Sequence, residues 1–358
     1  MLSLLLADRK YKIASAGEAA AKCRGSKDED DISYNHVSDY APFFEIDSHW
    51  QQLPSSPSNS GKMVLAESVR KNHDRLGRRV FNTHLRWDML PKRRKVSTSS
   101  TTQEEDGDNA RSSESSIMNK ERPQCGKFIY ITRNQIDVVA SFYHHLSNQK
   151  EGTYTDTFET FVQDWMEGKI PFGSSLDHLM SFAAGFADNL YDTSSSHDGH
   201  EVDDCDETSN QDQPLLLLSY ERMKSNLQTE VLRIISFLNL THIPLDVLTD
   251  ELLPSFEFNS MKNDIDKFQP KSVGWLNGFQ FLRRGVTGDG RRLMLITGGD
   301  DCNDNSGDGE REGESSELMD AYNDWVEREK YRSKISSLLQ ADCYEECREV
   351  FLSVVEMK

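Results

Sequence analysis

Short apolar runs alternate with amphipathic stretches through the middle of the chain. Segments 127–132 and 215–219 are rich in Leu, Ile and aromatic residues and predict buried strands. A weaker alternation of apolar and polar residues over 80–85 predicts another strand. Apolar residues recur at helical spacing in segments 2–23, 136–146, 158–167, 175–186, 227–238, 244–253 and 317–339. Short strands alternating with helices predict an α/β fold with a mainly parallel sheet flanked by helices.

Charge divides the chain into a neutral part and acidic segments. The formal net charge is −19 and the mean hydropathy is −0.67. Segments 101–116, 192–212 and 298–317 carry net charges of −4, −8 and −7, which leaves the remainder neutral overall. We therefore predict a single domain over 1–358, with disordered polar or acidic inserts at about 93–124, 190–213 and 295–316. The neutral remainder lacks the clustered Lys and Arg of a nucleic-acid surface, so no nucleic-acid partner is expected.

The sequence gives little support to a metal or a membrane. Its six cysteines lack the paired spacing of a zinc site. Asp301, Asn303, Asn305 and Glu312 match positions 1, 3, 5 and 12 of a calcium loop, but Ser306 replaces the glycine needed at position 6. No run approaches the roughly 18 apolar residues of a membrane span, and the apolar start is too short for a signal peptide. A soluble, cytoplasmic protein without metal or membrane partner is the prediction.

Candidate chemistry gathers where the predicted strand 127–132 ends. Arg133 follows this strand and directly precedes a predicted helix. Backbone N–H groups at a helix N-terminus favour an anion, and a guanidinium offers a bidentate fork to a phosphate. A plain ion pair between Arg133 and Asp137 explains the same residues. This segment alone favours neither interpretation.

Three segments carry a family resemblance. Segment 127–145 reads K-F-I-Y-I-T-R-N-Q-I-D-V-V-A-S-F-Y-H-H, segment 218–224 reads L-S-Y-E-R-M-K, and segment 281–289 reads F-L-R-R-G-V-T-G-D. Together with N-T-H-L at 82–85 and the pattern over 158–178, they resemble the cytosolic-type sulfotransferases, which use 3′-phosphoadenosine 5′-phosphosulfate (PAPS). The order and spacing agree from about residue 32 to residue 289, apart from the inserts. The resemblance implies the P-loop-like sulfotransferase fold.

The resemblance also implies roles for individual residues. Arg133 and Ser141 would bind the 3′-phosphate of the donor, and Tyr220 would contact its adenine. The loop that contains Arg283, Arg284 and Gly285 would close over the same phosphate. His84 would be the general base that takes the proton from an acceptor hydroxyl, a role that suits an imidazole. Without the neighbouring matches, His84 would be a hydrogen-bonded histidine at a strand end.

The sequence departs from the family pattern in three places. No P-K-x-G-T-T-W loop is present to hold the 5′-phosphosulfate, and Ser60-Gly61-Lys62 is a poor substitute. Met1 falls just downstream of the expected loop, so we expect a chain truncated at its start, without the first strand and loop. Asn82 replaces the lysine that precedes the catalytic histidine in the family, and Gly290 replaces the tryptophan that follows G-D.

Three functional hypotheses follow from these features. The first is an enzyme that moves a sulfuryl group from PAPS, as nucleotide donor, to the hydroxyl or amine of a small-molecule acceptor, without a metal. The second is a catalytically impaired relative or truncated product that binds the nucleotide without turnover. The third is a scaffold whose acidic inserts recruit basic partners. The sequence identifies neither the acceptor nor the oligomeric state.

Overall fold

The computed structural model describes residues 1–17, 34–46, 49–52, 63–90, 126–182, 215–276, 281–296 and 317–330. The predicted inserts and the calcium-loop pattern lie outside these residues, except that residues 295 and 296 end a helix. All six cysteines and Ser60-Gly61-Lys62 also lie outside them. The division into one domain with inserts therefore stays a prediction.

Two parallel strands form the centre of the described structure. β3 (Phe128–Thr132) pairs with β4 (Leu215–Ser219), with Phe128 opposite Leu215 and Thr132 opposite Ser219. Both strands fall where the apolar runs predicted them, and their parallel pairing is confirmed. Because the strands run in the same direction, their carboxyl ends meet at one edge of the sheet.

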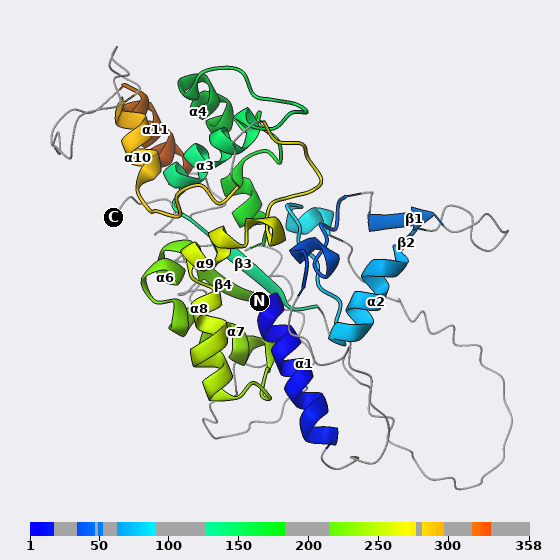
Figure 1. The fold of residues 1–358 in the computed structure, drawn as a ribbon. Helices are drawn as coiled ribbons and strands as arrows, with labels where there is room; N and C mark the ends of the chain where they lie inside the picture. Colours follow the sequence, from blue (N-terminus) through cyan, green and yellow to red (C-terminus); the bar gives the residue numbers. More distant parts are fainter. Residues whose placement is uncertain are drawn as a thin grey trace, which may run out of the picture.

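Side chains of β4 alternate between two hydrophobic cores. Leu217 packs into a core on one face of the sheet, whereas Leu216 and Leu218 pack into a core on the other face. The first core is built mainly from α3 (Gln135–Ser147), α4 (Phe158–Met166), α10 (Asp289–Ile296) and α11 (Glu317–Lys330). The second is built mainly from α1 (Leu2–Gly17), α7 (Leu227–Leu238) and η5 (Val247–Leu252). Figure 1 shows these two groups of helices on either side of β3 and β4.

Covering both faces explains why β4 is a run of leucines. Leu218 is 1% exposed, and burying a leucine side chain contributes roughly 1.5–3 kcal/mol. A strand with one solvated face would instead alternate apolar and polar residues. The fold is therefore mixed α/β, mostly helical around a small parallel sheet.

Segment 80–85 does not form the strand that its alternation of apolar and polar residues predicts. Only an isolated parallel bridge between Phe43 and Asn82 forms there, closed by the bonds Phe44 N–H to Asn82 O (2.8 Å) and Asn82 N–H to Pro42 O (2.9 Å). A strand needs a partner along its length, and among the described residues only 42–44 pair with it. The other described sheet is a short antiparallel pair, β1 (Trp50–Gln52) with β2 (Met63–Leu65).

The helix predictions hold with small changes of boundary. The predicted helix 2–23 is observed as α1, 175–186 is helical over its described part, 175–182, and 244–253 contains the π-helical turn η5. The remaining helical elements are η1 (Val37–Asp39), α2 (Glu67–Leu76), η3 (Trp87–Met89), α6 (Tyr220–Ser225), α8 (Leu253–Ser255), α9 (Phe258–Asn263) and η6 (Ile265–Lys267). Within the described part of the chain, no helix combines the length and apolar character that crossing a bilayer requires.

Candidate functional site

The carboxyl ends of β3 and β4 are joined by one glutamate. Glu221, in the first turn of α6, accepts hydrogen bonds from the backbone N–H of Asn134 (2.9 Å) and from the hydroxyl of Ser219 (2.8 Å). The side chain of Asn134 in turn caps α3 by accepting from the N–H of Ile136 at 3.1 Å. These bonds place the N-terminus of α3 beside the end of β4, at the edge of the sheet where ligands of parallel α/β sheets bind.

Arg133 lies between the strand end and a distant loop. Its guanidinium stacks over the ring of Tyr220 at 4.4 Å and donates to the carbonyl of Val286 at 3.1 Å. Asp137 Oδ2 lies 3.7 Å from Nη2 of Arg133. The Nε atom of Arg133 is buried and has no hydrogen-bond partner among the described residues. Arg133 is thus partly engaged and keeps a donor for a further acceptor.

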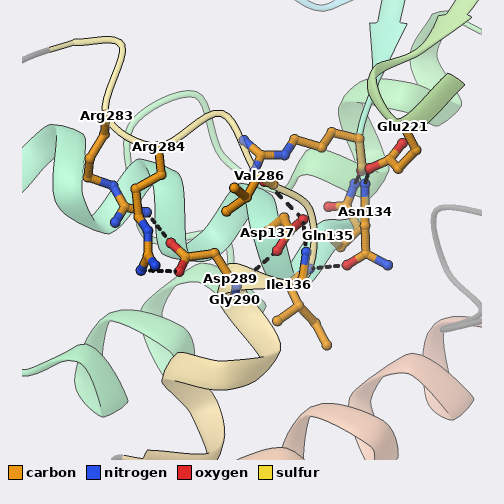
Figure 2. Close-up of polar contacts among 12 residues, drawn as sticks. Asn134, Gln135, Ile136, Asp137, Glu221, Arg283, Arg284, Val286, Asp289 and Gly290 are labelled. Atoms are coloured by element: carbon orange, nitrogen blue, oxygen red, sulfur yellow. Dashed lines mark hydrogen bonds and ion pairs between the residues drawn. The ribbon is translucent and has the colours of Figure 1, made fainter. Parts of the chain in front are cut away.

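Asp137 holds the distant loop against α3. Its carboxylate is 2% exposed and accepts from the backbone N–H groups of Gly288 (2.8 Å) and Gly290 (2.9 Å). These N–H groups lie at the start of α10, so Asp137 of one helix caps the N-terminus of another. Figure 2 shows Asp137 between the first turn of α3 and the loop that leads into α10. The alternative ion pair of Arg133 and Asp137 therefore exists, but Asp137 is buried and its main partners are the loop N–H groups.

Gly290 lies so close to α3 that no side chain fits. A Cβ atom there would lie 2.2 Å from the carbonyl oxygen of Ile136 and 2.8 Å from the N of Asp137. The tryptophan of the family pattern is therefore incompatible with this position, because the backbone of α3 occupies the space that a side chain would fill. Glycine at this position lets α10 pack directly against the backbone of α3.

Replacing Gly290 with alanine is expected to lower the free energy of unfolding by about 2–3 kcal/mol, because the clash is with backbone that cannot rotate away. Gly288 is the matched control. It has a φ of +82° and nothing within 4 Å of its Cβ position, so Gly288→Ala should cost only about 1 kcal/mol of backbone strain. Urea unfolding of the two variants measures the difference. Equal losses would contradict the close packing of α10 on α3.

Arg283 and Arg284 converge on the carboxylate of Asp289. Arg283 bonds Asp289 Oδ2, Arg284 Nη1 lies 2.8 Å from Oδ1, and Arg292 Nη2 lies 4.0 Å from Oδ1. Burial alone would raise the pKa of Asp289, but the hydrogen bond from Arg283 and the charges of the three guanidinium groups hold it below its usual value. Asp289 is therefore ionised at neutral pH.

The loop before α10 is shaped by a glycine in the left-handed region. Gly285 has a φ of +63°, and a Cβ there would meet the ring of Phe258 at 2.3 Å. The amino group of Lys262 donates to the carbonyl of Arg283 at 3.1 Å. Because both contacts come from α9, this helix also holds the loop in place. Figure 2 shows Arg283, Arg284 and Val286 along this loop.

His84 belongs to a second group, built on a carboxylate. Glu45 Oε1 accepts from the backbone N–H of His84 (2.8 Å) and lies 2.9 Å from its Nδ1. Burial would raise the pKa of Glu45, but the hydrogen bonds from His84 lower it. An ionised carboxylate only accepts, so Nδ1 carries the hydrogen and Nε2 is left as the basic nitrogen.

Two aromatic rings enclose the imidazole of His84. Phe43 stacks on it at 4.8 Å and Phe172 at 4.6 Å between ring centroids. Phe172 has a φ of +70°, an uncommon value for a bulky residue, and its side chain is 54% exposed. Phe142 of α3 lies 6.4 Å from Phe172. The helix α3 therefore carries Asp137, which holds the distant loop, near its start and contacts Phe172 beside His84 near its middle.

Comparison with known proteins shows a similarity to one family. The Sulfotransferase domain family model matches residues 116–190 and 205–295, which include both strands, α3, α6 and the loop before α10. Over these residues the chain is similar to the sulfotransferase family. Arg133, Ser141, Tyr220 and the loop 283–285 lie within the matched ranges, whereas His84 lies outside them.

Individual relatives agree with this similarity to sulfotransferases. Sulfotransferase 1E1 of Rattus norvegicus is 29% identical over 168 residues, which cover 46% of this chain and 48% of the relative. Sulfotransferase 1E1 of Bos taurus is 30% identical over 173 residues, which cover 48% and 50%. The chain spans about half the length of the curated relatives it matches.

Solved structures with some likeness to this chain share little sequence with it. Mouse sulfotransferase SULT7A1 complexed with PAP has a TM-score of 0.42 at 19% identity, covering 76% of this chain and 75% of that one. Retinol dehydratase in complex with androsterone and inactive cofactor PAP has a TM-score of 0.44 at 16% identity, covering 74% and 58%.

The structure brings most of the expected sulfotransferase residues into one region. Arg133 contacts both Tyr220 and the loop of residues 283–290, although about 150 residues of chain separate α3 from that loop. Ser141 is exposed on α3, one turn after Asp137, which places it on the same side of the helix. Gly285 lies in the loop with Arg283 and Arg284. The roles of these residues and of His84 stay predictions.

Sequence reasoning missed the residues that hold the site together. These are Glu45, Asp137 as anchor of the loop, Phe172, Glu221 and Asp289. One signal could have been used: Asn134 followed by Asp137 is a capping residue with an acid in the first turn, which predicts a helix start with acceptors facing a neighbour. Glu45 and Phe172 gave no such signal, because the residue that both contact, His84, is distant from each of them in sequence.

Proposed function

We propose that this protein binds PAPS and transfers its sulfuryl group to the hydroxyl or amine of a small molecule. One observation carries the proposal: Arg133 and the arginine-containing loop 283–290, distant in sequence, meet at the N-terminus of α3. A helix N-terminus with a guanidinium beside it suits a phosphate. Similarity to relatives named sulfotransferases supports PAPS as the nucleotide.

The donor's 3′-phosphate would lie beside Arg133, Arg283 and Arg284. Arg133 offers its buried Nε, which has no partner among the described residues, and Arg283 and Arg284 approach from the loop. The ring of Tyr220, half-buried beside Arg133, would pack against the adenine. Burial raises the pKa of Tyr220 although Arg133 opposes this, so its hydroxyl stays protonated and can donate.

His84 would act at the reacting end of the donor. Glu45 holds Nδ1–H, so Nε2 can take the proton of the acceptor hydroxyl while its oxygen forms a bond to sulfur. The bond from sulfur to the bridging oxygen of the 5′-phosphate then breaks, and adenosine 3′,5′-bisphosphate leaves with the electron pair. The stacked rings of Phe43 and Phe172 limit the faces from which an acceptor can reach the imidazole.

Nucleotide binding is tested by calorimetric titration with adenosine 3′,5′-bisphosphate. Arg133→Gln is expected to weaken binding by about 30-fold, since charge-assisted hydrogen bonds to a phosphate contribute about 1.5–3 kcal/mol. Arg79→Gln, which removes the same charge at an exposed position, is the matched control and should bind within about twofold of the parent chain. Equal affinities of all three proteins would contradict the assigned phosphate site.

A second candidate function is nucleotide binding without turnover. Asn82 stands where the family has a lysine, and its side-chain amide donates to the carbonyl of Ala41 at 3.0 Å. That bond directs the amide into the Phe43–Asn82 bridge and brings no positive charge to a leaving sulfuryl group. A protein that binds the bisphosphate but shows no transfer would favour this candidate.

A further inference from the structure

The arginines assigned to the nucleotide phosphate already hold an anion of the protein itself. Both oxygens of Asp289 are used: Arg283 bonds Oδ2, and Arg284 Nη1 lies 2.8 Å from Oδ1. The side chain of Asp289 is 10% exposed, so it is largely shielded from solvent. Figure 2 shows the ends of Arg283 and Arg284 directed toward the carboxylate of Asp289. A carboxylate and a phosphate oxygen present similar acceptors to a guanidinium fork.

Asp137, a second acidic residue beside this loop, has different partners from those of Asp289. Asp137 receives two backbone N–H groups at 2.8 and 2.9 Å and lies 3.7 Å from Arg133, so its main task is to hold the loop. The described hydrogen-bond partners of the Asp289 carboxylate are instead the long side chains of two arginines, Arg283 and Arg284. Its contacts can therefore be exchanged for those of another anion without unfolding the start of α10, which Asp137 caps separately.

We propose that Asp289 is an internal competitor for the nucleotide's 3′-phosphate, and so sets how tightly the nucleotide binds and how fast it leaves. This inference rests on the proposed nucleotide site. In the structure, Asp289 offsets part of the charge of Arg283 and Arg284. A bound phosphate must draw these arginines away from Asp289 or share them with it. Breaking the internal ion pairs costs free energy that offsets part of the attraction for the phosphate, and nucleotide binding is weaker as a result.

A purely structural role for Asp289 makes a different prediction. As the first residue of α10, an acid also interacts favourably with the helix dipole. If that were its only effect, replacing Asp289 would alter the stability of the loop and would change the affinity for all nucleotides alike. Competition instead requires that the change depend on the 3′-phosphate. Ligands with and without this group therefore distinguish the two roles.

The experiment compares two ligands on three proteins. The proteins are the full chain, Asp289→Asn, and Asp266→Asn as a control with the same change of charge at an exposed residue of η6. Asparagine keeps the size of the side chain and remains acceptable at a helix start. The ligands are adenosine 3′,5′-bisphosphate and adenosine 5′-monophosphate, titrated by calorimetry, and dissociation of the bisphosphate is followed by stopped flow.

Asp289→Asn is expected to bind the bisphosphate about fivefold more tightly than the parent chain and to release it about fivefold more slowly, as suits partly exposed ion pairs. Its affinity for the monophosphate should change by less than about twofold, and Asp266→Asn should match the parent chain with both ligands. Equal tightening for both ligands, or none for the bisphosphate, overturns the competition while leaving the nucleotide site standing. Absence of bisphosphate binding in every protein, with a cooperative thermal transition retained, contradicts the nucleotide site itself.

Discussion

Replacing His84 with alanine is expected to lower the rate of sulfuryl transfer from PAPS to 4-nitrophenol by about 10²–10³-fold, because a positioned general base contributes about that factor. Affinity for adenosine 3′,5′-bisphosphate should stay within about twofold, since the phosphate contacts proposed here come from Arg133 and the 283–290 loop. The measurement is release of the bisphosphate with time, with binding checked by calorimetry on the same preparation.

Two further variants give the His84 experiment its controls. Glu45→Gln presents an amide N–H to Nδ1 and so favours the wrong tautomer, which should slow transfer without removing the imidazole. His242→Ala removes a histidine that pairs with Asp8 of α1 and should leave transfer unchanged. Transfer by His84→Ala at the parent rate would exclude His84 as the base. Binding without transfer in the parent chain would favour the non-enzymatic candidate.

The parts of the fold that could be predicted are those in which the apolar pattern within a single segment determines its secondary structure. The apolar run at 215–219 predicts a strand buried on both faces, and Leu217 and Leu218 do enter two different cores. Helical spacing over 136–146 and 227–238 likewise predicts α3 and α7 within a residue or two. In each case local periodicity and tertiary burial agree.

Predictions failed where the outcome depends on a partner elsewhere in the chain. Segment 80–85 has the alternation of a strand, but only residues 42–44 pair with it in the described structure, so a single bridge forms at Asn82. The start of α10 was missed for a similar reason. Asp289-Gly290-Arg291-Arg292 has weak helical periodicity, and its N-terminus depends on a cap supplied by Asp137, about 150 residues earlier.

The candidate site also contains some residues that the sequence could predict and others that it could not. Arg133 and Arg283 could be proposed from ordered motifs, and the structure places the loop of Arg283 against α3. The family resemblance gave no reason to expect that Asp289 would occupy Arg283 and Arg284, because an ion pair formed after folding leaves no periodic trace. Nor could the sequence show that Gly290 excludes a side chain, since that depends on the distance between two helices.

Asp137 joins these separate elements, and its removal should have the largest effect on stability. Asp137→Ala is expected to lower the free energy of unfolding by about 3–5 kcal/mol, the usual loss when one partner of a buried charged network is removed. Two backbone N–H groups, of Gly288 and Gly290, lose their acceptor, and Arg133 loses a neighbouring charge. Guanidinium chloride unfolding followed by circular dichroism measures the loss.

The conservative variant separates capping from charge. Asp137→Asn keeps one carbonyl oxygen that can accept from one of the two N–H groups, so its loss should be about half that of Asp137→Ala. Asp264→Asn removes an exposed carboxylate paired with Lys267 and should change stability by less than about 0.5 kcal/mol. Because the loop must be held before its arginines can meet a phosphate, Asp137→Ala should also bind adenosine 3′,5′-bisphosphate more weakly, opposite in sign to Asp289→Asn. An Asp137→Ala protein as stable as Asp264→Asn would show that the loop is anchored by other contacts.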